Sequence, residues 1–97
     1  MTPAEYTKRA LRTEKTPAYM RDDHRLSRVD HAIKGIVTEA GELTDALKKH
    51  LIYGKPLDTT NLVEEAGDVL WYLALLLDAV GSSFDSAMER NSAKLAV

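Results

Sequence analysis

The sequence predicts an all-α fold, a helical bundle with two long antiparallel central helices. Three observations support this prediction. Apolar residues recur at steps of three and four over about residues 25–51 and 59–80, which is the period of a helix. No run of residues alternates between apolar and polar as a half-buried strand would. Only a short loop separates the two long segments, so they should lie side by side in opposite directions.

A short helix is expected first. Thr2 followed by Pro3 indicates an N-cap with proline at the first helical position, and this helix should fade near Thr13. Thr16 and Pro17 then interrupt the helical pattern. Residues 1–27 carry more basic than acidic side chains. We therefore expect this segment either to lie over an anionic ligand or to pack on a neighbouring subunit.

The first long helix should begin at about Arg25 or Ser27. It ends at the sequence Tyr53-Gly54-Lys55-Pro56, because glycine suits a left-handed C-cap and proline cannot continue a helix. Its apolar stripe extends over about seven turns and consists of Ile33, Ile36, Val37, Ala40, Leu43, Leu47 and Leu51.

The second long helix can be capped by Asp58, Thr59 or Thr60 and should run to about Val80, where Gly81 stops it. A last helix follows, with Ser82 or Ser83 as its cap. Its apolar residues are Phe84, Ala87, Met88 and Leu95.

The second half of the second long helix is apolar on nearly every side. Leu73 and Leu75 point to opposite faces, and one chain of 97 residues has too few helices to cover both. We therefore expect a homo-oligomer, a dimer or a tetramer, that completes a four-helix core.

Length and composition set the remaining limits. A chain of 97 residues suits a single domain spanning residues 1–97, and its net charge of −2 gives no electrostatic reason to expect nucleic acid or a membrane as partner. The chain has no cysteine, and Met1–Lys15 lack the apolar run of a signal peptide, so a cytoplasmic location is expected. The apolar run Val69–Leu77 is about half the length that spans a bilayer.

Two pairs of acidic residues are candidates for a metal site. Glu39 and Glu42 lie one turn apart on the first long helix, and Glu65 and Asp68 lie one turn apart on the second. Each pair flanks its apolar stripe, so the pairs can converge between antiparallel helices, and Gly35 leaves space nearby. Four half-buried carboxylates repel by on the order of several kcal/mol unless protons or cations offset them. A hard divalent cation with oxygen ligands, such as Mg²⁺, is the natural occupant.

Simpler interpretations stand beside this one. A single acid pair at this spacing is most often solvated surface, and the absence of cysteine and of Glu-x-x-His gives little support for zinc or a di-iron site. His31 suits a capping or packing role, and Lys49 is typical of a solvated face although it projects towards the acids. Trp71 suits the core or an interface, whereas Asn61 and Tyr72 share the sector of the second acid pair.

The two acidic motifs resemble a known family. "HAIKGIVTEAGELTDALKK", followed after a Gly-Lys-Pro turn by "NLVEEAGDVLWYLALLLDAVG", is similar to the all-α nucleoside triphosphate pyrophosphohydrolases of the MazG-like superfamily, which includes dimeric dUTPases and phosphoribosyl-ATP pyrophosphatase. Glu-x-x-Glu on one helix and Glu-x-x-Asp on the next are the mark of these proteins. The similarity extends to "ERNSAKL", which resembles the Asn-x-x-Lys of their last helix, and covers about Arg28 to Leu95.

The resemblance implies an enzyme that uses Mg²⁺, with Mn²⁺ as a substitute. Such an enzyme hydrolyses a nucleoside or deoxynucleoside triphosphate to the monophosphate and pyrophosphate, for example in nucleotide-pool sanitation. By the same resemblance, one set of residues would hold the metal and carry catalysis: Glu39, Glu42, Glu65 and Asp68. A second set would contact the phosphates, namely Asn91, Lys94 and Lys49, and a third would contact the base and sugar, namely His31, Asn61 and Tyr72.

Two further expectations concern the family pattern. Relatives often continue past Asn-x-x-Lys into an arginine and an aromatic residue, whereas this sequence ends at Val97. An alternative function is therefore a catalytically inactive metal-binding or protein-interaction module of the same fold. Gly41 and Gly67 lie within the acidic motifs, where glycine costs about 1 kcal/mol relative to alanine. We expect them to permit a close approach of the two long helices.

Overall fold

Four α-helices make up the regular structure of the chain. The computed structural model describes residues 1–15 and 24–96, and this part of the chain contains no strand. The all-α prediction is therefore confirmed, while the expected break at Thr16 and Pro17 lies outside the described residues. The helices are α1 (Pro3–Leu11), α2 (His24–Leu51), α3 (Thr59–Ala79) and α4 (Phe84–Leu95).

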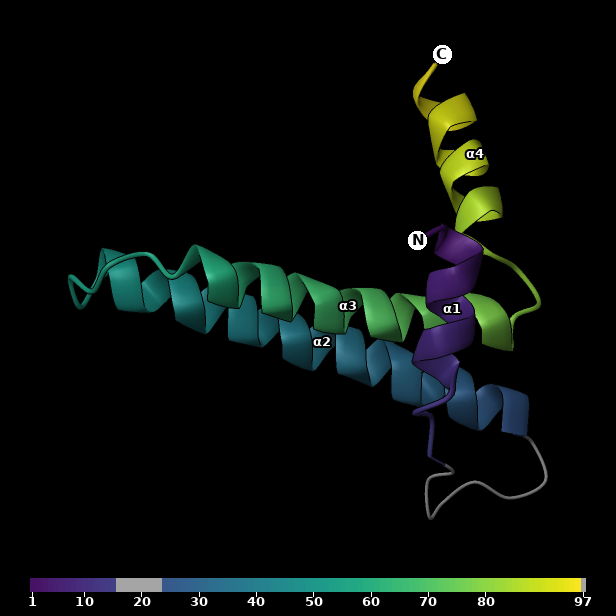
Figure 1. The fold of residues 1–97 in the computed structure, drawn as a ribbon, viewed down its shortest axis with the longest axis horizontal. Coiled ribbons are helices and arrows are strands. Elements are labelled where there is room, and N and C mark those ends of the chain that lie inside the picture. Colours follow the sequence, from purple (N-terminus) through teal and green to yellow (C-terminus); the bar gives the residue numbers. More distant parts are fainter. Residues whose placement is uncertain (16–23, 97) are drawn as a thin grey trace.

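The two long helices form an antiparallel hairpin (Figure 1). α1 crosses α3 near the open end of this hairpin, and α4 leaves the same end at an angle of 95° to α3. The two long antiparallel helices are thus as predicted. The completion of a four-helix core by a second copy remains a prediction.

Capping residues fix where the helices begin and end. The side chains of Thr2, Asp58 and Ser83 each accept a hydrogen bond from the backbone amide three residues on, at 3.1, 3.0 and 3.2 Å. Asp58 therefore holds the cap of α3. Gly54 and Gly81 have φ angles of 68° and 72°, which L-residues with a side chain rarely adopt, so glycine suits both turns.

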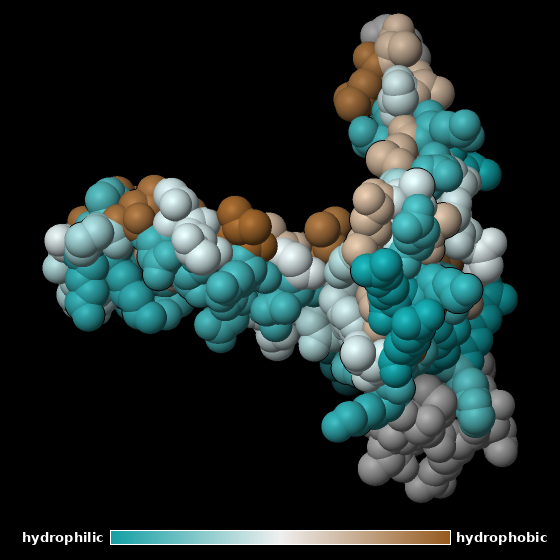
Figure 2. Space-filling view, in the orientation of Figure 1, coloured by the Kyte–Doolittle hydropathy of each residue, from teal (hydrophilic) through white to brown (hydrophobic). Residues whose placement is uncertain are grey.

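The chain encloses few of its apolar side chains. Among the described residues, Leu75 is the largest side chain that is fully buried, whereas Leu73 keeps part of its surface. Val37, Leu51 and Val63 on the two long helices are 66%, 68% and 72% exposed. Figure 2 shows apolar residues gathered along the edge of the hairpin that faces the open space beside α4. An apolar surface of this kind is typical of an interaction site.

Within residues 1–15 and 24–96, no single helix is long and apolar enough to cross a membrane. Taken together, α3 and α4 have the length and apolar composition of a membrane span, but the pair is bent by 95°.

Candidate functional site

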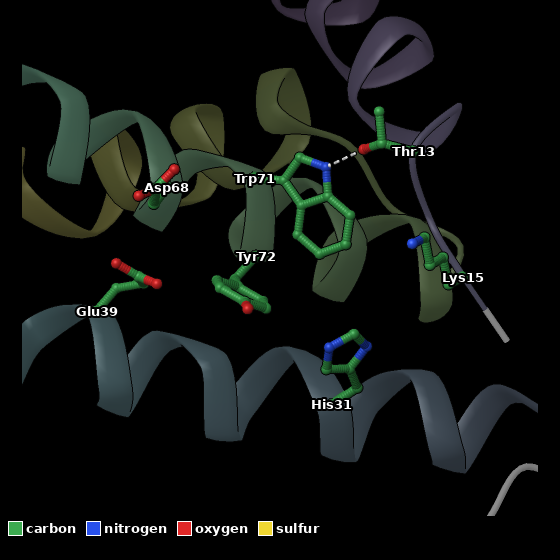
Figure 3. Close-up of a pocket in the computed structure, with 7 residues that line it drawn as sticks. All are labelled: Thr13, Lys15, His31, Glu39, Asp68, Trp71 and Tyr72. Atoms are coloured by element: carbon green, nitrogen blue, oxygen red, sulfur yellow. Dashed lines mark hydrogen bonds between the residues drawn. The ribbon is translucent and has the colours of Figure 1, made fainter. Parts of the chain in front are cut away.

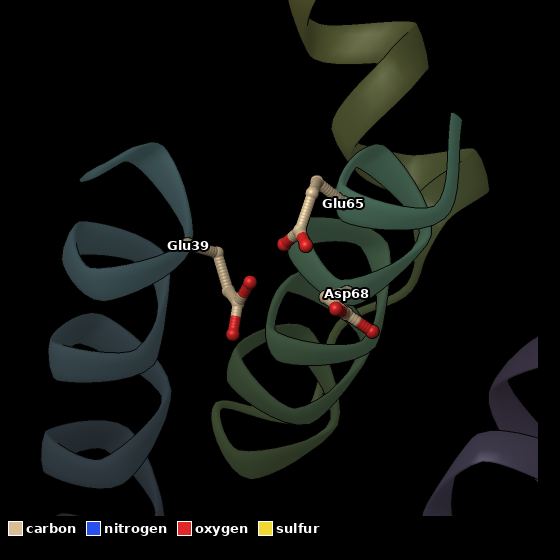
Figure 4. Close-up of side chains that lie close together, drawn as sticks. All are labelled: Glu39, Glu65 and Asp68. Carbon is tan, nitrogen blue, oxygen red and sulfur yellow. The ribbon is translucent and has the colours of Figure 1, made fainter. Parts of the chain in front are cut away.

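Three carboxylates from the two long helices come together near the middle of the hairpin. Glu39 projects from α2 towards Glu65 and Asp68 on α3 (Figure 4), and each offers an oxygen within 4.8 Å of the other two. The spacing i, i+3 places Glu65 and Asp68 on one face of α3. We call Glu39, Glu65 and Asp68 the carboxylate cluster.

Three negatively charged carboxylates repel one another in this cluster. Partial burial raises the pKa of Glu39, and its hydrogen bond to Glu65 and the negative charges of Asp68, Glu65 and Glu42 raise it further. The protonated form of Glu39 is therefore favoured at a higher pH than usual when no cation is present. All donor atoms are carboxylate oxygens, which suit a hard cation better than zinc. The cluster is accordingly a suitable metal site.

The raised pKa of Glu39 leads to a prediction about stability in the absence of metal. Between the ordinary value of 4.5 and the raised value, the folded chain binds more protons than the unfolded chain. The contribution of Glu39 to the free energy of unfolding therefore falls as pH rises through this window. In a chelating buffer, Glu39→Gln should be more stable than the unmodified chain at neutral pH, and the difference should shrink towards about pH 4.

Thermal unfolding across this pH range measures the effect. Glu64→Gln is the matched control, because Glu64 is exposed and lies outside the cluster. An equal gain in both variants would mean that net charge, and not the cluster, is responsible.

Three aromatic side chains lie beside the carboxylates. His31 on α2 and Trp71 and Tyr72 on α3 pack edge to face, with ring centroids 6.1 Å apart for His31 and Trp71, 5.7 Å for His31 and Tyr72, and 5.1 Å for Trp71 and Tyr72. We call these residues the aromatic cluster. Rings arranged in this way offer flat, apolar faces to a ligand.

Tyr72 is held in place by a glycine on the opposite helix. Gly35 is buried, and a Cβ atom built there would overlap the Tyr72 ring. Tyr72 can lie across α2 only because position 35 has no side chain. By contrast, a Cβ atom at Gly41 or Gly67 would have nothing within 4 Å. The expectation that Gly41 and Gly67 permit the close approach of the two long helices is therefore wrong within one chain. Gly35 is the glycine that permits it.

The segment of residues 1–15, which we call the N-terminal segment, is fastened to α3 beside this site. The Trp71 indole Nε1 donates to the carbonyl oxygen of Ala10 and to Thr13 Oγ1, both at 2.9 Å. The Tyr6 hydroxyl donates to the carbonyl oxygen of Gly67 at 3.4 Å. Burial raises the pKa of Tyr6, and the negative charge of Asp68 raises it further.

An ion-pair network fastens the end of the N-terminal segment. Arg28 on α2 donates to Glu14 from Nε at 2.9 Å and from Nη2 at 3.2 Å, and its Nη2 also reaches Asp78 of α3 at 2.7 Å. One guanidinium thus joins the N-terminal segment to both long helices. Such bidentate geometry fixes direction as well as distance.

Residues of the carboxylate cluster, the aromatic cluster and the N-terminal segment line an open pocket of about 350 Å³ (Figure 3). Glu39 and Asp68 stand at one end and the aromatic cluster in the middle. Thr13 and Lys15 of the N-terminal segment complete the lining. The volume lies within the range of small-molecule sites.

The other predicted site residues lie outside this lining. Glu42 is exposed one turn beyond Glu39, and Asn61 is half-buried one turn before Glu65. Lys49 is exposed near the tip of the hairpin, where it pairs with Asp45 at 3.3 Å. Asn91 and Lys94 are also exposed and lie on α4, which projects away from the hairpin (Figure 1).

Sequence reasoning missed three residues of the pocket. The position of Trp71 in the sequence favours the core or an interface, and no motif points to Thr13 or Lys15. The basic character of residues 1–27 was the available signal, since it suggested a segment lying over an anionic ligand.

Comparison with known protein families identifies a matching domain. Residues 28–96 match the MazG nucleotide pyrophosphohydrolase domain, which confirms the resemblance that the acidic motifs indicated. No curated protein and no solved structure matches the chain. The match includes α2 from Arg28 onwards, α3 and α4, and it leaves out the N-terminal segment.

Proposed function

Because this match covers more than half of its length, the chain belongs to the MazG nucleotide pyrophosphohydrolase family, and we propose that it hydrolyses a nucleoside or deoxynucleoside triphosphate to the monophosphate and pyrophosphate. The observation that carries the proposal is one pocket with carboxylates at one end and aromatic rings beside them. A nucleoside triphosphate has corresponding parts, a polyanion that binds through a cation and a flat base that stacks on rings. Nucleotide-pool sanitation is the role we propose.

The metal in this proposal is Mg²⁺, with Mn²⁺ as a substitute. Glu39, Glu65 and Asp68 would hold it, with Glu42 as the fourth ligand taken from the family motif. Mg²⁺ neutralises charge on phosphate oxygens and polarises the phosphoryl group when it is bound. The repulsion within the carboxylate cluster supports this part of the proposal, because a cation relieves it.

The remaining roles, activation of water and binding of the substrate, fall to different side chains. A glutamate of the family motifs orients the attacking water and accepts its proton. The water oxygen forms a bond to the α-phosphorus, the bond from that phosphorus to the bridging oxygen breaks, and pyrophosphate leaves. The aromatic cluster holds the base, so that the phosphates lie towards the acids. Asn61 remains a predicted contact to the sugar, and Lys49 a predicted contact to the phosphates.

A homo-oligomer, dimer or tetramer, is also part of the proposal. The exposed apolar side chains of Val37, Leu51 and Val63 support it. Asn91 and Lys94 stand outside the pocket, so a contact between them and the phosphates would come from α4 of a second copy. Light scattering should give a particle of at least two chains, and a monomer at micromolar concentration would contradict the proposal. The cytoplasmic location remains a prediction.

A nucleotide panel tests the activity. Purified protein with Mg²⁺ should release pyrophosphate and a monophosphate from at least one canonical or damaged nucleoside triphosphate, and a chelator should stop the reaction. Release of inorganic phosphate alone would mean that a bond other than the one between the α-phosphorus and its bridging oxygen is cleaved, which would contradict the proposal. If no nucleotide were cleaved while Mg²⁺ still raised the melting temperature, the non-catalytic metal-binding module would be favoured instead.

A further inference from the structure

A lysine lines the end of the pocket away from the carboxylates. Lys15 lies at that end, and the aromatic cluster separates it from Glu39 and Asp68 (Figure 3). The N-terminal segment that supplies Lys15 lies outside the matched residues 28–96. Lys15 is therefore supplied by a part of the chain that the family match does not cover.

Lys15 is held at this place by the residues just before it. Thr13 Oγ1 accepts from Trp71 and donates to the carbonyl oxygen of Ala10 at 2.7 Å, while Glu14 is bound by Arg28 through two hydrogen bonds. The backbone that leads into Lys15 is thus fixed on both α2 and α3. Within the described residues, Lys15 has no ion-pair or hydrogen-bond partner of its own. Its ammonium is free to bind a ligand.

We propose that Lys15 selects the nucleobase, by donating hydrogen bonds to a keto oxygen on its edge. This inference rests on the proposed function, in which the phosphates lie at the carboxylates and the base lies against the aromatic cluster. The outer edge of such a base faces Lys15. A lysine ammonium has three donors and no acceptor. It therefore favours guanine, thymine or uracil, which present O6 or O4 as an acceptor, over adenine and cytosine, which present an amino donor at that position.

Thr13 adds little to the choice of base. Its hydroxyl hydrogen is already donated to Ala10, and one lone pair is already used by Trp71. Of the two lining residues that the N-terminal segment supplies, Lys15 is accordingly the one with free hydrogen-bond donors.

The test compares Lys15→Met with the unmodified chain. Methionine keeps a long apolar stem and removes the donors, so kcat/KM for keto-base triphosphates such as dGTP and dUTP should fall roughly tenfold, as for the loss of one charge-assisted hydrogen bond. The values for dATP and dCTP should change little, so the preference disappears. Lys15→Arg should retain it. The matched control is Lys8→Met, because Lys8 is exposed on α1 and does not line the pocket.

A second readout needs no turnover. Trp71 is the only tryptophan of the chain and belongs to the aromatic cluster, so its fluorescence should be quenched when a base stacks there. With Mg²⁺ present, the monophosphate dGMP should quench at lower concentration than dAMP, and Lys15→Met should abolish this difference.

The outcomes separate this inference from the proposed function. Turnover with an equal loss for all four nucleotides in Lys15→Met would make Lys15 a phosphate contact and overturn base selection, and no loss for any of them would also overturn it. If none of the nucleotides in the panel were cleaved, the proposed function would be rejected, and equal quenching by dGMP and dAMP in the presence of Mg²⁺ would overturn the inference even then.

Discussion

Asp68→Asn should lower the rate of nucleoside triphosphate hydrolysis by about 100-fold or more. The variant keeps the shape of the side chain but removes one negative charge from the carboxylate cluster, where the three ligand atoms lie within 4.8 Å of one another. A bound metal ion contributes several kcal/mol to the stabilisation of phosphoryl transfer, and about 1.4 kcal/mol corresponds to a tenfold change in rate. Initial rates of pyrophosphate release over a range of Mg²⁺ concentrations measure the effect.

Two companion variants make this result specific. Glu65→Gln should lose activity to a similar extent, because Glu65 belongs to the same cluster. Glu64→Gln changes the neighbouring residue, which is exposed and outside the cluster, and should keep its activity. All three variants should retain the helical spectrum of the unmodified chain. Activity that survives both Asp68→Asn and Glu65→Gln would reject the cluster as the catalytic metal site.

The variant Glu42→Gln tests the one acidic residue of the family motifs that lies outside the carboxylate cluster. Glu42 is exposed, yet its charge contributes to the raised pKa of Glu39. If Glu42 is a fourth ligand, the Glu42→Gln variant should need a higher Mg²⁺ concentration than the unmodified chain to reach its half-maximal rate. An unchanged Mg²⁺ dependence would restrict the ligands to the carboxylate cluster.

The helices and the convergence of the acids follow from local sequence rules. Asp58, Gly54 and Gly81 set the helix limits through capping and left-handed φ angles that only a few residue types adopt readily. The spacing of Glu65 and Asp68 put both on one face of a helix, and the short loop made the long helices antiparallel. These features depend on neighbours within a few positions, which a single sequence shows directly.

The walls of the pocket depend on contacts between residues that are far apart in the sequence. The spacing of apolar and acidic residues along a helix does not show such contacts. Trp71 bonds with Ala10 and Thr13, 61 and 58 positions away, and these contacts bring the N-terminal segment to the site. The role of each glycine also depends on contacts between the two helices. A helical wheel places Gly35 and Gly41 by angle, but it does not show which of them faces a ring on the other helix.

Gly35→Ala should destabilise the chain although alanine is the better helix former. The added Cβ would overlap the ring of Tyr72, and overpacking of this kind costs about 1–3 kcal/mol. At Gly41 the same substitution meets nothing within 4 Å, so the gain in helix propensity of up to about 1 kcal/mol should remain. The two variants should therefore shift the melting temperature in opposite directions, by roughly 4–8 °C for each kcal/mol.

A double-mutant cycle with Tyr72 identifies the cause. If the overlap with the ring is responsible, Gly35→Ala should cost nothing in a Tyr72→Ala background, where the space above position 35 is open. In the unmodified background, displacement of Tyr72 should also weaken quenching of Trp71 by nucleotides, because the two rings are in contact with centroids 5.1 Å apart. A stabilising Gly35→Ala, or an equal cost in both backgrounds, would contradict this role for Gly35. An equal cost in both backgrounds would mean that glycine is needed at position 35 for the backbone itself, and that Tyr72 owes its place to the other rings of the aromatic cluster.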